Sequence, residues 1–204
     1  VGHHEVTGRA LEHLYRYYAS VRPGLQLAAF VAASGSSVTL AAGERLKADH
    51  GARIAAVEAL ECPTMLYNGF GEHNIQGIGD KHIPLIHNIT NTDGVVGVSD
   101  RACDELGMAF NTPEGLAHLA SSGVGNTVLG TLGHLGLSSI CNVVASIKVA
   151  RELDLGPDDA IVTVATDGAE LYGSEREAMR AGRYAAGFSE TDATTAVAAH
   201  LHGV

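Results

Sequence analysis

Residues 25–37 read LQLAAFVAASGSS, a mostly apolar run that passes directly into hydroxyl residues around one glycine. Residues 25–33 have the length and composition of a strand that is buried on both faces, as in a parallel sheet. Residues 37–50 follow with a helical pattern. A buried strand, a turn of small residues and a helix in this order form the repeating unit of an α/β fold.

The same alternation continues along the chain. Apolar runs at residues 53–59, 95–98 and 160–165 predict three more strands, and helices are expected at residues 5–19, from the Ser99 cap to about Leu106, from Thr112 onward, and at 138–153, 174–185 and 189–201. We therefore predict an α/β fold, a three-layer parallel sheet with helices on both faces, in which residues 1–204 form a single domain.

Composition narrows the class of protein. The chain is 46% hydrophobic and has 13 basic and 23 acidic residues, and its net charge of -10 argues against binding to nucleic acid or to an anionic membrane. Cys62, Cys103 and Cys141 are scattered and odd in number, which disfavours both a disulfide framework and a zinc site. No apolar run approaches the ~20 residues of a membrane span. We expect a cytoplasmic protein.

The turn after the first strand is a candidate phosphate site. Ser34, Gly35, Ser36 and Ser37 lie where a strand enters a helix, and free backbone N–H groups and the positive end of a helix dipole favour an anion there. The plainer interpretation is a turn in which a serine caps the helix. A nucleotide phosphate is a third possibility, but no Walker lysine and no Gly-x-Gly-x-x-Gly opening accompany the loop.

Two further segments carry candidate residues. Residues 71–84 read GEHNIQGIGDKHIP, in which Gly77, Ile78 and Gly79 would let the backbone lie against a flat ring without an intervening side chain. A tight glycine turn is the simpler alternative. Residues 165–168 read ATDG and place Thr166 and Asp167 directly after the last predicted strand.

The chain also contains Thr7-Gly8 and the stretch GLSS at residues 136–139. In their order, all these segments resemble the second half of cysteine-synthase-type enzymes. Those enzymes are fold-type II enzymes, which depend on pyridoxal phosphate and share the tryptophan-synthase-β-like fold. The resemblance covers nearly the whole chain and implies pyridoxal 5'-phosphate as cofactor. It implies contacts to the phosphate from Ser34, Gly35, Ser36 and Ser37, and a substrate-side turn of Gly77, Ile78 and Gly79.

The resemblance leaves the partner of the pyridine nitrogen open between Thr166 and Asp167. A carboxylate at that nitrogen would favour the protonated ring and strengthen it as an electron sink, whereas a threonine would keep the milder electronics of the family. Asp167 has a third role open to it, a local hydrogen bond in a turn. Two departures leave the substrate undetermined, since Ile140 replaces a glycine of the family and the segment between Leu106 and Gly133 is longer.

Enzymes of this family hold the cofactor aldehyde as a Schiff base with a lysine. Lys47, Lys81 and Lys148 do not stand in the family's lysine motif, and we expect them to be surface or salt-bridged residues. The resemblance thus implies no catalytic residue in this chain and a second polypeptide that supplies the lysine with the N-terminal half of the fold, as a separate gene product or a cleavage product. A heterotetramer follows by analogy, and a truncated inactive fragment is the alternative.

The implied reaction is a β-elimination, such as C–S bond cleavage, or a β-replacement, such as cysteine synthesis. The substrate class is cysteine, an S-conjugate of cysteine or an activated serine. A non-catalytic regulatory or scaffolding subunit with the same fold is the alternative from another class, because fold alone does not imply activity.

Overall fold

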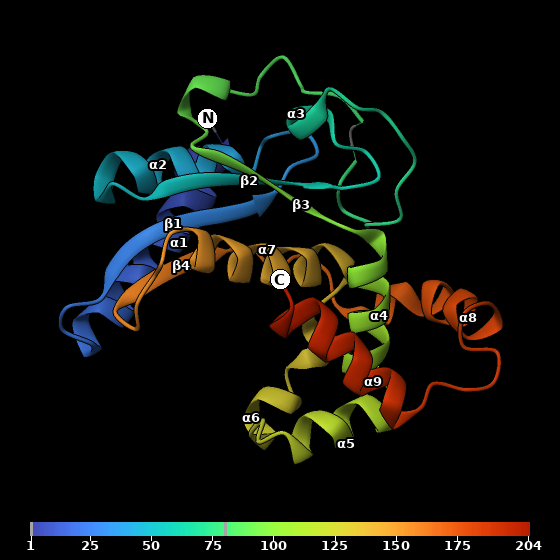
Figure 1. Ribbon diagram of the computed structural model, residues 1–204. Coiled ribbons are helices and arrows are strands. Elements are labelled where there is room, and N and C mark those ends of the chain that lie inside the picture. The colour runs from blue at the N-terminus through green and yellow to red at the C-terminus, as the bar shows by residue number, and fades with distance from the viewer. Residues whose placement is uncertain (1, 80) are drawn as a thin grey trace.

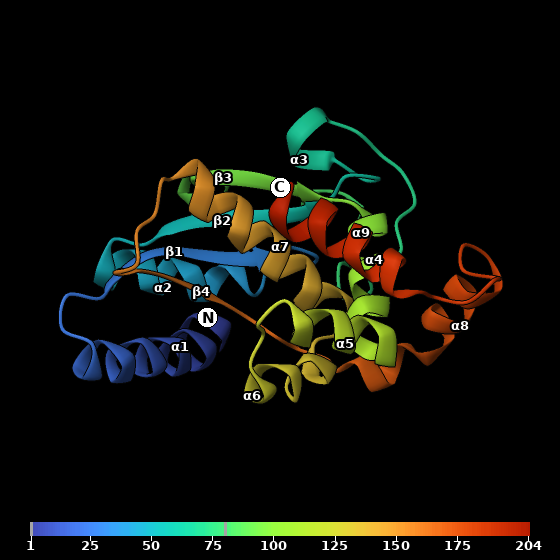
Figure 2. The same ribbon diagram turned by 60° about the horizontal axis from the view of Figure 1, so that its bottom comes forward.

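The computed structural model describes residues 2–79 and 81–204, and its centre is a four-stranded parallel sheet covered by helices on both faces (Figures 1 and 2). The strands are β1 (Gln26–Ala33), β2 (Arg53–Ala59), β3 (Gly94–Val98) and β4 (Asp159–Thr163), in the spatial order β3-β2-β1-β4. Because all pairs are parallel, the carboxyl ends of the four strands meet at one edge of the sheet. The predicted three-layer α/β fold is confirmed.

Helices α1 (Gly2–Val21) and α2 (Leu40–His50) cover one face, and α4 (Asp100–Asn111), α7 (Leu137–Glu152) and α9 (Glu190–Val197) lie on the other. The remaining helices are α3 (Thr64–Tyr67), α5 (Pro113–Ser121), α6 (Asn126–Leu129) and α8 (Gly173–Ala181). Short turns of other helix types are η1 (Ile89–Asn91), η2 (Leu132–His134), η3 (Ala169–Tyr172) and the π-helical η4 (Ala198–His202).

The apolar strands fill two separate cores because successive side chains of a strand point to opposite faces. Phe30 and Ile54 pack with α2 on one face, whereas Val31 and Val57 pack with α4 and α7 on the other. All four side chains are almost completely buried. This double burial explains why these strands are nearly continuous apolar runs in the sequence.

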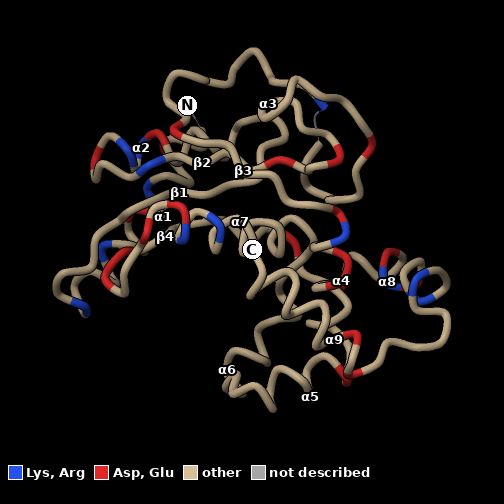
Figure 3. The backbone as a smooth tube through the Cα atoms, viewed as in Figure 1, with Lys and Arg blue, Asp and Glu red and all other residues tan. Residues whose placement is uncertain are grey.

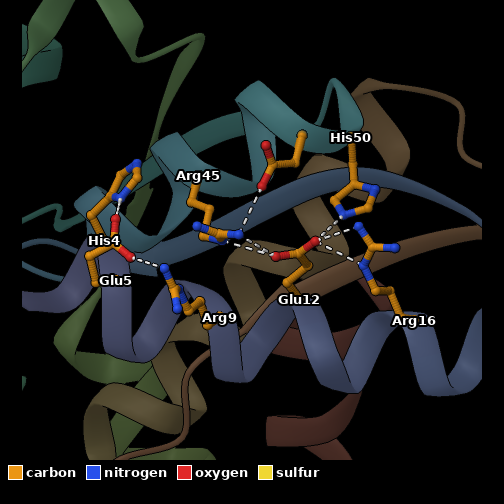
Figure 4. Close-up of polar contacts among 8 residues, drawn as sticks. His4, Glu5, Arg9, Glu12, Arg16, Arg45 and His50 are labelled. Atoms are coloured by element: carbon orange, nitrogen blue, oxygen red, sulfur yellow. Dashed lines mark hydrogen bonds and ion pairs between the residues drawn. The ribbon is translucent and has the colours of Figure 1, made fainter.

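Helix α1 is fixed to α2 by a buried carboxylate (Figure 4). Glu12, which is only 7% exposed, accepts hydrogen bonds from Arg16 Nε at 2.8 Å and from Arg45 Nε at 2.9 Å. His50 Nε2 lies 3.4 Å from the same carboxylate. The bonds from Arg16 and then Arg45 lower the pKa of Glu12 from 4.5 to about 2. The Glu12 carboxylate thus joins α1 to α2, the helix that follows the serine loop.

Several predicted helix boundaries were wrong. Helix α1 begins at Gly2 rather than at residue 5, and α8 ends at Ala181 rather than near residue 185. Helix α2 begins at Leu40 rather than at residue 37, because Ser37 has a positive φ of 63° that a right-handed helix cannot contain. Helix α4 continues to Asn111 rather than ending near Leu106, since its apolar residues 106–110 remain buried against the core. The predicted cap is confirmed, because Ser99 Oγ accepts from the Ala102 amide at 3.2 Å.

The three cysteines are free thiols and all are buried. Cys103 and Cys141 lie in the core between α4 and α7, and the neighbouring Cys141 thiol together with burial raises the pKa of the Cys103 thiol. Acidic and basic residues both occur along α2 and along α8 (Figure 3). Within the described residues, no helix has the length and apolar content needed to cross a bilayer.

Candidate functional site

The carboxyl edge of the sheet brings the serine loop close to the last strand. β1 pairs with β4 so that Val31 lies opposite Thr163, and Ser34 and Thr166 each follow three residues later. The buried side chain of Asn142 on α7 joins the two strand ends, since its Oδ1 accepts from the Ala33 amide at 2.7 Å and its Nδ2 donates to the Val164 carbonyl at 2.9 Å.

The serine loop has two facing hydroxyls and one left-handed residue. Ser34 and Ser37 are buried, and their hydroxyl oxygens face each other at 3.4 Å, while Ser36 is exposed and Gly35 partly so. Ser37 is in the left-handed region with φ 63°, a conformation that also occurs in loops whose N–H groups converge on an anion. In the described chain Thr39, not a serine, occupies the N-cap of α2, and its side chain makes no capping bond.

The predicted glycine turn and Thr166 meet at one buried hydroxyl, although β4 ends at Thr163 rather than at the predicted residue 165. Gly77 has φ 98°, and a Cβ added there would lie 2.7 Å from Ser138 Oγ, so only a glycine fits at this approach. Ser138 Oγ lies 3.3 Å from Thr166 Oγ1, and the Thr166 amide donates to Ser139 Oγ at 3.3 Å. The first turn of α7 thus links Gly77 to Thr166.

Ser34 and Ile78 line the same small hollow, which has a volume of about 10 Å³. His73 and His82 complete part of its wall, and both ring nitrogens of His73 are buried without a hydrogen-bond partner in the described part of the chain. The serine loop and the glycine turn are therefore neighbours. Gly79 is exposed at the end of the turn.

Asp167 is engaged differently from Thr166. Its carboxylate accepts a hydrogen bond from the Tyr172 hydroxyl at 3.1 Å, and its carbonyl accepts from the Gly136 amide at 2.7 Å. Burial, and then the carboxylate of Asp167, raise the pKa of Tyr172 to about 12. The carboxylate of Asp167 is therefore bonded to η3 and its carbonyl to the residue that precedes α7.

Two acidic residues of α4 hold the start of the glycine turn, a role that was not predicted from the sequence. Asp100 Oδ2 accepts from the Asn74 amide at 2.7 Å, and Asp104 Oδ1 accepts from Asn74 Nδ2 at 3.2 Å. Burial raises the pKa of Asp104 to about 6, with a further contribution from the charge of Asp100. The only local signal is the spacing of four, which places both carboxylates on one face of a helix.

The lysines lie as surface or paired residues. Lys47 Nζ is 2.7 Å from Asp93 Oδ1, and Lys148 Nζ donates to the Gly97 carbonyl at 2.8 Å. Lys81 forms an ion pair with Glu72. Lys47 and Lys81 are salt-bridged as expected, whereas Lys148 is half-buried and bonds a main-chain carbonyl instead of a carboxylate.

The parallel sheet with helices on both faces is part of the fold of the cysteine-synthase-like enzymes, which depend on pyridoxal phosphate. The chain is homologous to cysteine synthase B of Campylobacter jejuni subsp. jejuni, with 35% identity over 149 residues, or 72% of this chain and 43% of the relative. No family model matches the chain.

Solved structures give the same assignment. A hydrogen sulfide-producing enzyme from Fusobacterium nucleatum superposes with a TM-score of 0.62 and 27% identity, covering 85% of this chain and 46% of that enzyme. An O-acetylserine dependent cystathionine β-synthase from Helicobacter pylori has a TM-score of 0.55 and 25% identity, covering 79% and 46%. The chain thus has part of the tryptophan-synthase-β-like fold and spans less than half the length of these relatives.

The residues at this edge fit pyridoxal phosphate. Facing hydroxyls and a left-handed serine suit a phosphate. The turn at Gly77 leaves backbone rather than a side chain beside Ser138, whose hydroxyl lies 3.3 Å from that of Thr166. The chemistry that pyridoxal phosphate supplies when bound is an electron sink for the substrate α-carbon.

Proposed function

We propose that this chain is the cofactor-binding part of an enzyme that uses pyridoxal phosphate for β-elimination or β-replacement on cysteine, an S-conjugate of cysteine or an activated serine. The observation that carries the proposal is the meeting of the serine loop, the Gly77 turn and Thr166 at one edge of the sheet. Among the similar solved structures are hydrogen sulfide-producing and O-acetylserine dependent enzymes, which act in this reaction class.

Each segment has one task in the proposal. Ser34, Gly35, Ser36 and Ser37 bind the phosphate through hydroxyl and amide donors. Gly77, Ile78 and Gly79 line the substrate side. Thr166, and not Asp167, faces the pyridine nitrogen. Ser138 contacts both Thr166 and the Gly77 turn, whereas the Asp167 carboxylate already accepts a hydrogen bond from Tyr172.

The Schiff-base lysine and the N-terminal half of the fold belong to a second polypeptide in this proposal, with residues 1–204 as one cofactor-binding domain. Support comes from the coverage of 43% to 46% of the relatives and from the engaged lysines. We propose a heterotetramer of two such pairs, located in the cytoplasm because the free buried cysteines suit a reducing compartment.

The test is borohydride reduction of natively purified material followed by peptide mass spectrometry. A pyridoxyl lysine on a second, co-purifying chain is the expected result. A label on Lys47, Lys81 or Lys148 would contradict the split site. Absence of any label would favour the regulatory or scaffolding subunit, or an inactive fragment.

Substitutions then test the individual contacts in the native complex. Ser34→Ala should weaken cofactor retention at least about tenfold, since a hydrogen bond to a charged group contributes about 1.5 to 3 kcal/mol, whereas Ser122→Ala on an exposed helix end should not. Thr166→Val should shift the absorption of the bound cofactor, and Asp167→Asn should leave it unchanged. The reverse pattern would assign the ring nitrogen to Asp167.

A further inference from the structure

The glycine turn is held at two points, by α4 at Asn74 and by α7 at Gly77. At the first point the Asn74 amide donates to Asp100 Oδ2 at 2.7 Å, and Asn74 Nδ2 donates to Asp104 Oδ1 at 3.2 Å. At the second point a Cβ on Gly77 would lie 2.7 Å from Ser138 Oγ. Only two residues separate Asn74 from Gly77, so a displacement of Asn74 also moves the turn against α7.

The groups that hold Asn74 are themselves fixed. Both carboxylate oxygens of Glu61, which follows β2, accept from the Asp100 amide, at 3.1 and 3.0 Å. A Cβ on Gly71 would overlap the Glu61 carbonyl oxygen, so the backbone that leads into Asn74 lies directly against the same residue. Asn74 is therefore bonded to a firm support rather than to mobile surface side chains.

The residues between the two points are held by apolar burial. Ile75 is 1% exposed and belongs to the core that contains Leu106 of α4, and the Ile78 amide donates to the Ile75 carbonyl at 3.2 Å. Apolar burial is non-directional, whereas a hydrogen bond requires a particular distance and angle. The bonds of Asn74 therefore set the orientation of the turn, and the isoleucines set its depth.

We propose that Asn74 is a positioning residue of the candidate site, which sets the gap between the Gly77 turn and Thr166 through its two bonds to α4. The inference rests on the proposed function only for the presence of a cofactor in that gap. Ser138 transmits the position, because it lies against Gly77 on one side and its Oγ lies 3.3 Å from Thr166 Oγ1 on the other.

The side-chain bond has a direction that substitutions can reverse. Burial raises the pKa of Asp104 to about 6, so at pH 8 its carboxylate is ionised and can only accept. Asn74→Asp then removes the donor and places a third carboxylate beside those of Asp100 and Asp104, where like charges repel. Adding Asp104→Asn restores one donor and one acceptor, with the donor now at position 104.

Hydrogen exchange of the natively purified complex at pH 8 measures how firmly the turn is held. Asn74→Asp should speed exchange of the amides of residues 75–78 at least tenfold, and the double variant with Asp104→Asn should return most of the protection. Asn126→Asp is the matched control, because it makes the same chemical change at an exposed residue of α6 and should leave these amides unaffected. No recovery in the double variant would overturn the proposal.

The spectrum of the bound pyridoxal phosphate separates a positioning role from a merely structural one. Asn74→Asp should shift the absorption and fluorescence of the bound cofactor, and the double variant should restore both. Faster exchange with an unshifted spectrum would overturn the proposal. If Asn74→Asp does not fold, Asn74→Ala supplies the same test with a smaller change, because it loses the bond to Asp104 and keeps the amide bond to Asp100.

The two proposals fail in different ways. A pyridoxyl lysine on the partner, with a spectrum that Asn74→Asp leaves unchanged, would remove the positioning role and keep the proposed function. Protection that is lost in Asn74→Asp and recovered in the double variant, without a pyridoxyl group on any chain, would keep the positioning of the turn and remove the function.

Discussion

Replacing Glu12 by glutamine should destabilise the protein at neutral pH and much less at low pH. The carboxylate is 7% exposed and is bound by Arg16 and Arg45, which lower its pKa from 4.5 to about 2. At about 1.4 kcal/mol per pKa unit, this shift corresponds to about 3 kcal/mol. Because Arg16 is well exposed and solvent screens its charge, we expect a loss of about 2 kcal/mol at pH 7.

The pH dependence follows from the direction of the shift. A carboxyl whose pKa is lower in the folded state binds more protons when the chain unfolds. The contribution of Glu12 to the free energy of unfolding is therefore fully present above about pH 5 and is lost as the pH falls toward 2. Urea unfolding at pH 7 and at pH 3 should show the difference between wild type and Glu12→Gln falling to less than half.

Glu5 offers the matched control on the same helix. It pairs with Arg9 but has an exposed side chain, so Glu5→Gln should change stability little at either pH. Equal losses for Glu12→Gln at pH 7 and pH 3, or a loss at pH 7 no larger than that of Glu5→Gln, would refute the reasoning.

Three further substitutions test the site. Asp104→Asn should raise the free energy of unfolding at pH 7 by about 1 to 2 kcal/mol, because burial raises the pKa of Asp104 to about 6 and the folded state disfavours its charged form. The same substitution should remove the decline in stability of the wild type between pH 4 and 7, and urea unfolding across this range measures both effects. Gly77→Ala should cost about 1 kcal/mol or more, given φ 98° and a Cβ 2.7 Å from Ser138 Oγ, and the double variant with Ser138→Gly should recover part of the loss in the same assay. Asn142→Leu should cost about 2 kcal/mol or more, because it leaves the Ala33 amide and the Val164 carbonyl unpaired, whereas Asn142→Asp, which keeps the acceptor for Ala33, should cost less. No loss for Asn142→Leu would show that the bridge does not stabilise the strand ends.

Strand positions followed closely from the sequence, because parallel strands buried on both faces must be continuous apolar runs. Residues 53–59 were predicted without error, and the first strand begins one residue later than predicted. The start of α2 was wrong because a single left-handed residue, Ser37, stands in a stretch whose composition is otherwise helical. Composition does not report the backbone angle of one serine.

The contacts that hold the candidate site in place could not be predicted from the sequence, for a different reason. Asn74 meets Asp100 and Asp104 across 26 and 30 residues, and Asn142 meets Ala33 across 109. No local pattern encodes contacts of that range. The roles of Ser34, Gly77 and Thr166 could be named only through a resemblance, and they remain predictions for the labelling and substitution experiments.

The reactivity of the three buried thiols reports on opening motions of the protein. Cys103 and Cys141 are at most 1% exposed in the core, whereas Cys62 is 4% exposed beside the hollow at Ser34. A thiol reagent can therefore modify Cys103 only in molecules that have opened their core, and the rate measures how often that occurs. If Cys62 is modified faster than the other two, the edge that carries the candidate site opens while the rest of the fold stays closed.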